Sequence, residues 1–153
     1  MRKLKKENVK YIIVHCSDTL PGQPCNAEII NDWHIRRGFE MIGYHYVILP
    51  DGTIEHGRPL FYEGAHCKAG GRNHDSIGVC YVGGRNAEGV CADTRTEQQK
   101  SVLGTLLKEL LRRFPKAKIA GHHDFDRGKE CPCFDAKIEK FLPCKRPEVE
   151  RKN

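Results

Sequence analysis

The order of apolar and polar residues predicts a chain in which strands and helices alternate. Residues 9–15 (VKYIIVH) are rich in β-branched side chains and predict a buried strand. Asn26 is a favourable N-cap for a helix that ends at Gly38. Residues 42–49 and 53–56 flank a Pro-Asp-Gly turn. This turn predicts a β-hairpin after the first strand and helix.

The second half of the chain continues the alternation. Residues 61–73 have no consistent period and predict an irregular loop, after which residues 76–82 (SIGVCYV) predict a strand. Thr96 and Gln99 form a capping-box pattern, and apolar residues then repeat at helical spacing until Pro115. This long amphipathic helix is the clearest element in the pattern.

The end of the chain completes the predicted fold class. Residues 118–120 predict a short strand, and residues 134–141 predict a last helix. Helices interspersed with strands favour an α/β fold, with a central mixed β-sheet flanked by helices. We expect one domain over residues 9–142, between a basic N-terminal tail (residues 1–8) and a C-terminal tail (residues 143–153).

Length and hydropathy agree with this organisation. A chain of 153 residues with 39% hydrophobic content supports one packed core and is too short for two ordinary domains. No apolar run approaches the roughly 20 residues that cross a bilayer, and residues 11–14 are too few for a secretory signal. We expect that the protein does not insert into a membrane. We also expect that it is made in the cytoplasm. The alternative is a periplasmic or secreted protein whose leader is not part of this sequence.

Charge and cysteine content narrow the choice of partners. The net charge of +6 favours polyanions, but the basic residues do not form the aromatic-interleaved stripe of nucleic-acid-binding proteins. A nucleic-acid partner is therefore not expected. Eight cysteines suggest disulfides, although the missing leader weakens that expectation. If one cysteine binds a metal, an odd number remains, so at least one more is unpaired. The candidates for bridges are Cys25, Cys67, Cys91, Cys133 and Cys144.

Histidines and cysteines supply the candidate chemistry. His15 ends a predicted buried strand, where open α/β sheets place functional groups, although a lone histidine is more often structural. Zinc prefers imidazole and thiolate, and a catalytic zinc site has three protein ligands. His15, His122 and Cys131 fit that set. A closed site that uses His122, His123, Cys131 and Cys133 is less favoured, because adjacent histidines on a strand point to opposite faces.

Six strings in the sequence carry a resemblance to a known family. They resemble, in collinear order, the N-acetylmuramoyl-L-alanine amidase type 2 family, which includes phage amidase-type lysozymes and peptidoglycan-recognition proteins. No single string is decisive, but six in order are highly specific. The strings are IIVHCSDT (12–19), GYHYVILPDGTIEHGR (43–58), GAH (64–66), SIGVCYVGG (76–84), GHHD (121–124) and KECPCFD (129–135).

The resemblance implies a zinc amidase that cleaves the bond between N-acetylmuramic acid and L-alanine in peptidoglycan. By position, His15, His122 and Cys131 match the zinc ligands, and Tyr44 and Lys129 match catalytic residues of the family. Zinc lowers the pKa of its water from 15.7 to about 7 and polarises a carbonyl. Lys129 would stabilise the oxyanion, and Tyr44 would orient the water, carry its proton or contact the substrate.

Other interpretations of these residues stay open. Tyr44 is equally compatible with packing in the cleft wall, and Lys129 with a solvated surface charge. His66, within the GAH string, is expected to contact the substrate, and His45 to have a structural role because it faces the other side of its strand. A non-catalytic peptidoglycan-binding module is the main alternative function. Loss of the cysteine ligand marks such relatives, and this chain retains Cys131.

The remaining expectations concern the biological setting. The resemblance and the absent leader favour a phage or prophage lytic enzyme, an endolysin, that acts on the cell wall as a monomer. A nucleic-acid or regulatory binding protein is the second alternative. It predicts binding that is sensitive to salt and indifferent to metal.

Overall fold

A computed structural model of the protein describes residues 1–137. Five strands and two α-helices follow one another along the chain, with three short 3-10 helices at Lys6–Asn8, Ala69–His74 and His122–Asp124. The strands and helices are β1 (Tyr11–Cys16), α1 (Ala27–Arg36), β2 (Tyr46–Ile48), β3 (Ile54–His56), β4 (Ser76–Tyr81), α2 (Glu97–Arg113) and β5 (Lys118–Gly121).

The strands form one mixed sheet in the order β3-β2-β4-β1-β5. Strand β1 pairs in parallel with β4 on one side and with β5 on the other, and β2 is parallel to β4. Only the edge strand β3 is antiparallel, because it forms the predicted hairpin with β2. The predicted fold class, an α/β domain around a central mixed sheet, is confirmed.

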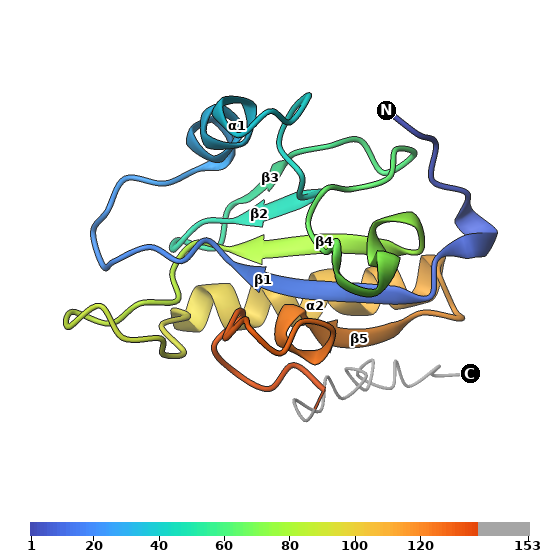
Figure 1. The fold of residues 1–153 in the computed structure, drawn as a ribbon. Coiled ribbons are helices and arrows are strands. Elements are labelled where there is room, and N and C mark those ends of the chain that lie inside the picture. The colour runs from blue at the N-terminus through green and yellow to red at the C-terminus, as the bar shows by residue number, and fades with distance from the viewer. Residues whose placement is uncertain (138–153) are drawn as a thin grey trace, which may run out of the picture.

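Helix α2 covers one face of the sheet (Figure 1). Its buried residues Leu103 and Leu107 belong to the same core cluster as Ile12 and Val14 of β1. The predicted capping box begins the helix: the Thr96 hydroxyl accepts from the backbone N–H of Gln99, and the Gln99 side chain accepts from the N–H of Thr96. The strongest periodic signal in the sequence thus supplies four buried leucines to this core cluster, Leu103, Leu106, Leu107 and Leu110.

Helix α1 lies on the opposite face. Its buried Ile30 packs in a second cluster with Val47 of β2 and Cys80 of β4. The helix begins as predicted, since the Asn26 side chain accepts from the backbone N–H of Ile29. Side chains alternate between the two faces of a strand, and Ile12 and Val14 face α2. His15 therefore points to the face that carries α1.

The two ends of the described chain add detail to the sequence expectations. Residues 1–8, the expected N-terminal tail, run beside residues 61–63, and Leu4 is buried in the core cluster. Residues 134–137 form bends and turns, and the rest of the helix expected at 134–141 lies outside the described residues. Within residues 1–137, neither α-helix is long and apolar enough to cross a bilayer.

Candidate metal centre

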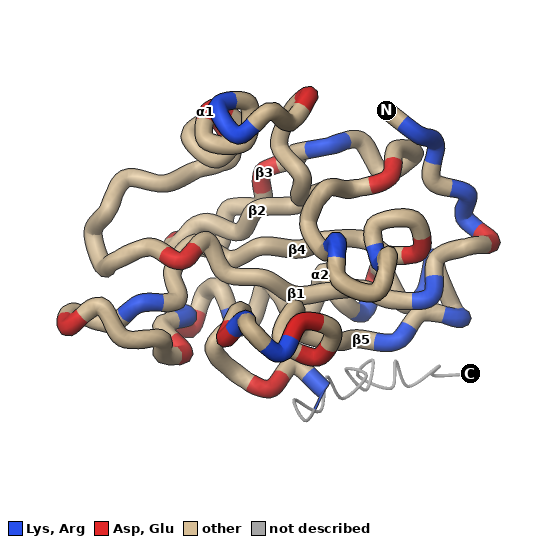
Figure 2. Tube along the Cα trace, viewed as in Figure 1, with Lys and Arg blue, Asp and Glu red and all other residues tan. Residues whose placement is uncertain are grey.

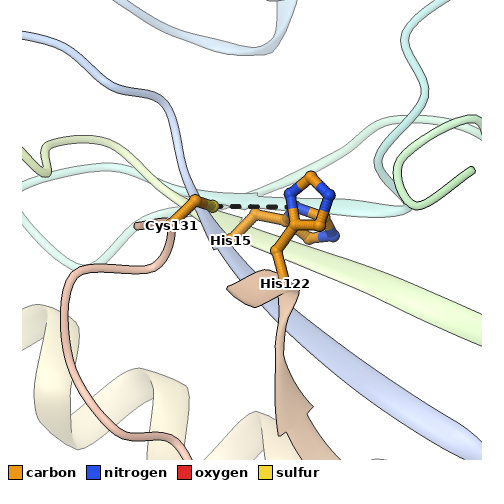
Figure 3. Close-up of side chains that lie close together, drawn as sticks. All are labelled: His15, His122 and Cys131. Carbon is orange, nitrogen blue, oxygen red and sulfur yellow. Dashed lines mark hydrogen bonds between the residues drawn. The ribbon is translucent and has the colours of Figure 1, made fainter. Parts of the chain in front are cut away.

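Three side chains that are distant in the sequence converge at one edge of the sheet (Figure 3). His15 lies near the carboxyl end of β1, and His122 follows β5 directly. These strands are parallel neighbours, so their carboxyl ends meet. Cys131 comes from the loop after β5. The nearest ligand atoms of the three residues lie within 4.8 Å of one another.

The geometry and the donor types of this cluster fit zinc. Cys131 Sγ lies 3.8 Å from Nδ1 of His15. A tetrahedral zinc ion with bonds of about 2.0–2.3 Å separates its ligand atoms by roughly 3.3–3.6 Å, so this pair is nearly at that spacing and the cluster, within 4.8 Å, would close slightly around the ion. Two imidazoles and one thiolate are also a ligand set of catalytic zinc sites, which keep a position open for water.

The protonation states of the two histidines favour metal binding. Burial lowers the pKa of His15 well below its usual value, and burial also lowers the pKa of His122. Both imidazoles are therefore neutral at pH 7 and have a lone pair available. The Cys16 thiol and burial raise the pKa of Cys131. A bound cation acts in the opposite direction, because it stabilises the thiolate.

The loop that carries Cys131, residues 125–136, is fixed at several points. The backbone N–H of Cys16 points at Cys131 Sγ at 3.1 Å, and the N–H of His123 donates to the Cys131 carbonyl at 2.8 Å. The Tyr81 hydroxyl donates to the carbonyl of Pro132 at 2.6 Å. These contacts hold the cysteine ligand against the ends of β1 and β4.

A disulfide adds a covalent anchor to this loop. Cys133 is bonded to Cys91, which lies in the segment between β4 and α2. Both cysteines were candidates for bridges from the sequence alone. The bond excludes Cys133 as a thiolate ligand, and the His123 ring faces the carbonyl of Glu130. The closed site built on His123 and Cys133 is therefore wrong.

An open cleft of about 900 Å³ is lined by two of the three ligands, His122 and Cys131. Tyr44, His122, Lys129 and Cys131 are among the residues that line it. The Tyr44 ring lies 5.0 Å from the His15 ring, and burial raises the pKa of Tyr44 well above its usual value, so its hydroxyl stays protonated at neutral pH. The structure thus gathers the residues expected to take part in catalysis, while their individual roles stay predictions.

Charges of both signs lie on the loop beside this cleft (Figure 2). Asp126, Arg127, Lys129 and Glu130 follow one another within a few residues. Proteins that bind nucleic acid present a face of one sign to the phosphate backbone. The mixed rim of this cleft does not have that character.

His66 lies next to His15 and is also among the residues that line the cleft. It is 8% exposed, and its Nδ1 is 2.8 Å from Nε2 of His15. Its expected contact with the substrate stays a prediction. The contact of His66 with a ligand histidine, and that of Ser76 with His66, were not predicted from the sequence. The glycines of the GAH and SIGV strings were the available signal, because glycine marks places of close approach.

An α/β domain with a three-ligand cluster beside an open cleft is the arrangement of a metal-dependent hydrolase. The chain matches the sequence profile of the N-acetylmuramoyl-L-alanine amidase family over residues 5–134. It is 41% identical over 133 residues to the endolysin of Escherichia phage T7, across 87% of this chain and 86% of that protein. It is 42% identical over 126 residues to the endolysin of Enterobacteria phage T3, across 82% of each chain.

A solved structure gives the same assignment. The N-acetylmuramoyl-L-alanine amidase LysC from Clostridium intestinale URNW has a TM-score of 0.75 and 28% identity, over 89% of this chain and 84% of that one. The chain therefore belongs to the N-acetylmuramoyl-L-alanine amidase family. It is an enzyme, a peptidoglycan amidase, and the family and activity expected from the sequence are confirmed.

Proposed function

We propose that this amidase uses zinc, held by His15, His122 and Cys131, to hydrolyse the bond between N-acetylmuramic acid and L-alanine. The convergence of two neutral imidazoles and one thiol beside an open cleft carries the proposal. A zinc ion bound there supplies Lewis acidity, which activates water near neutral pH and polarises the amide carbonyl. The remaining chemistry belongs to side chains of the cleft.

Lys129 stabilises negative charge in the transition state. Its backbone N–H donates to the carbonyl of Asp126 at 3.0 Å, which fixes the start of its side chain in the cleft. A positioned ammonium group favours the oxygen of the scissile carbonyl as that oxygen gains charge. It has less effect on the neutral ground state, so its contribution falls on kcat.

Tyr44 transfers a proton in the same cleft. Its hydroxyl is protonated at neutral pH and is able both to donate and to accept a hydrogen bond. Next to His15, it orients the attacking water and passes a proton toward the leaving amine of L-alanine. His66 lines the same cleft, where its mostly buried ring offers only a small surface for a direct contact with the substrate.

The similarity to phage endolysins supports a lytic role for this enzyme. We propose that it is made in the cytoplasm, reaches the cell wall and acts on peptidoglycan as a monomer. Its relatives in phages T7 and T3 share more than two fifths of their aligned residues with it. The synthesis in the cytoplasm and the lytic role are thus parts of one proposal.

The test measures free amino groups released from purified peptidoglycan. Each hydrolysed bond produces one new α-amino group of L-alanine. We expect release by the wild type, loss of release after chelation, and recovery with added zinc. The Cys131→Ser variant should lose both bound zinc and activity. Cys25→Ser is the matched control, because Cys25 is a free cysteine outside the cluster and should leave both properties unchanged.

Three results would contradict the proposal. Equal release with and without the chelator would show that zinc is not needed. Binding to peptidoglycan without any release, at full zinc occupancy, would favour the non-catalytic binding module instead. Full activity in Cys131→Ser would remove this cysteine from the ligand set.

A further inference from the structure

A chain of hydrogen bonds leads from the candidate metal centre into the core. Nδ1 of His15 faces Cys131, and Nε2 of the same ring faces His66 at 2.8 Å. The other nitrogen of His66, Nε2, lies 3.2 Å from the hydroxyl of Ser76. That hydroxyl donates to the backbone carbonyl of Arg72 at 2.6 Å. The chain is thus His15, His66, Ser76 and the Arg72 carbonyl.

The carbonyl at the inner end decides the direction of every bond in the chain. A carbonyl oxygen only accepts, so the Ser76 proton is committed to Arg72. The Ser76 oxygen then accepts the proton on Nε2 of His66. In a neutral imidazole the other nitrogen carries the lone pair, so Nδ1 of His66 accepts from Nε2–H of His15. This leaves the lone pair of His15 on Nδ1, which faces the cluster.

The ring of His66 is also held in one orientation. It meets the His15 ring edge-on, with centroids 4.9 Å apart and an interplanar angle of 88°. A Cβ atom at Gly78 would lie 2.7 Å from two ring carbons, and one at Gly64 would lie closer still. The ring therefore fits in a slot that exists because both positions are glycine. The Asn73 side chain accepts from the backbone N–H of His66 and fixes its main chain.

We propose that His66 is a positioning residue, which with Ser76 fixes the His15 imidazole in the tautomer and orientation that present Nδ1 to a divalent cation. The inference rests on the proposed zinc function of His15, His122 and Cys131. It differs from the expectation that His66 contacts substrate, because it assigns His66 a role in metal affinity that is independent of substrate. Outer-sphere partners of metal-binding histidines contribute typically 10- to 100-fold to affinity.

The experiment measures zinc affinity by competition with a chromophoric chelator, and records the visible spectrum of the cobalt(II)-loaded protein. Neither measurement involves substrate. In His66→Leu the acceptor for His15 is lost, and we expect zinc binding about 10- to 100-fold weaker with an altered cobalt spectrum. In Ser76→Ala the tautomer of His66 is no longer fixed, and we expect a smaller loss. In His66→Asn, Oδ1 occupies the position of Nδ1 and should restore most of the affinity.

His45→Gln is the matched control. His45 is also buried, and its ring lies 5.9 Å from that of His66, but its nitrogens bond to the backbone of Gly78 and Tyr62. The His45→Gln variant tests whether a general loosening of the core weakens zinc binding. We expect its zinc affinity to stay within about threefold of the wild type, which is less than the 10- to 100-fold loss expected from an outer-sphere partner. If His66→Leu does not fold, His66→Asn and Ser76→Ala carry the test.

Several outcomes overturn the inference. Wild-type affinity in both His66→Leu and Ser76→Ala would show that the chain does not act on the ligand. An equal loss in His45→Gln would assign the effect to packing. Both results bear on the inference only when the wild-type protein binds zinc. A wild-type protein that binds no zinc would instead refute the proposed function, and this inference with it.

Discussion

Reduction of the Cys91–Cys133 disulfide should destabilise the fold substantially. The bond joins the segment between β4 and α2 to the loop that carries Cys131. In the unfolded chain it closes a loop, which limits the conformations that the chain can adopt. Reduction removes this limit and leaves most native contacts in place, so the unfolded state gains stability relative to the native state.

The loop length sets the size of the effect. The two cysteines are 42 residues apart. For such a loop the chain-entropy relation gives about 4 kcal/mol at 25 °C, and natural disulfides contribute typically about 2–4 kcal/mol. A urea m-value of about 2 kcal/mol/M converts this range into a midpoint shift of about 1–2 M.

The assay is urea unfolding followed by fluorescence of Trp33, the single tryptophan. It is performed with chelator present, so that metal binding does not contribute, and with or without a phosphine reductant. The wild type should lose about 2–4 kcal/mol on reduction. Cys91→Ser should have the lower stability from the start and should not respond to the reductant. Cys25→Ser keeps the bond and should respond like the wild type.

Two observations would refute this reasoning. One is an unchanged midpoint in wild-type protein whose mass and thiol content show that the bond is reduced. The other is an equal response to reductant in Cys91→Ser, since that variant has no bond at this position. Either result would mean that the loop is held by its other contacts and that the bond adds little.

Three further predictions concern the site and its support. Lys129→Met should lower kcat on peptidoglycan about 100-fold with zinc content unchanged, and an unchanged kcat would exclude the ammonium from the transition state. Tyr81→Phe leaves the buried Pro132 carbonyl without its donor, and should lower the free energy of unfolding by about 1–3 kcal/mol in urea titrations. Burial lowers the pKa of His34 and of His45 to about 4 in the native state. Between about pH 6.5 and 4 the unfolded chain therefore binds more protons than the native protein does. Stability should therefore be fully present above pH 6.5 and fall as the pH drops to 4, less steeply in His45→Gln. A pH-independent midpoint would contradict this.

The sequence predicted the parts of the fold that depend on local patterns. The β-branched run before His15 became β1, and the capping box at Thr96 began α2, because both signals lie within a few residues. The order of strands in the sheet could not be predicted from local patterns. It depends on contacts between β1, β4 and β5 that are distant in the sequence, and periodicity does not encode them.

The ligand set was also predictable, whereas its surroundings were not. His15, His122 and Cys131 stand out because their chemistry is rare and their neighbouring strings resemble a known family. The contacts of His66 and Ser76 have no such signal, since each depends on where a loop folds back on β4. The partner of Cys133 was equally open, because pairing of cysteines follows from their distance in space.

The origin of the three ligands constrains when the metal centre forms during synthesis. Two of them lie near the carboxyl ends of β1 and β5, which pair directly, and the third lies ten residues after the end of β5. A nascent chain on the ribosome therefore has the first donor 116 residues before it has Cys131. Any ion captured at this cluster joins β1 to the segment that follows β5, so it reinforces the folded domain and gives no help to products truncated before Cys131.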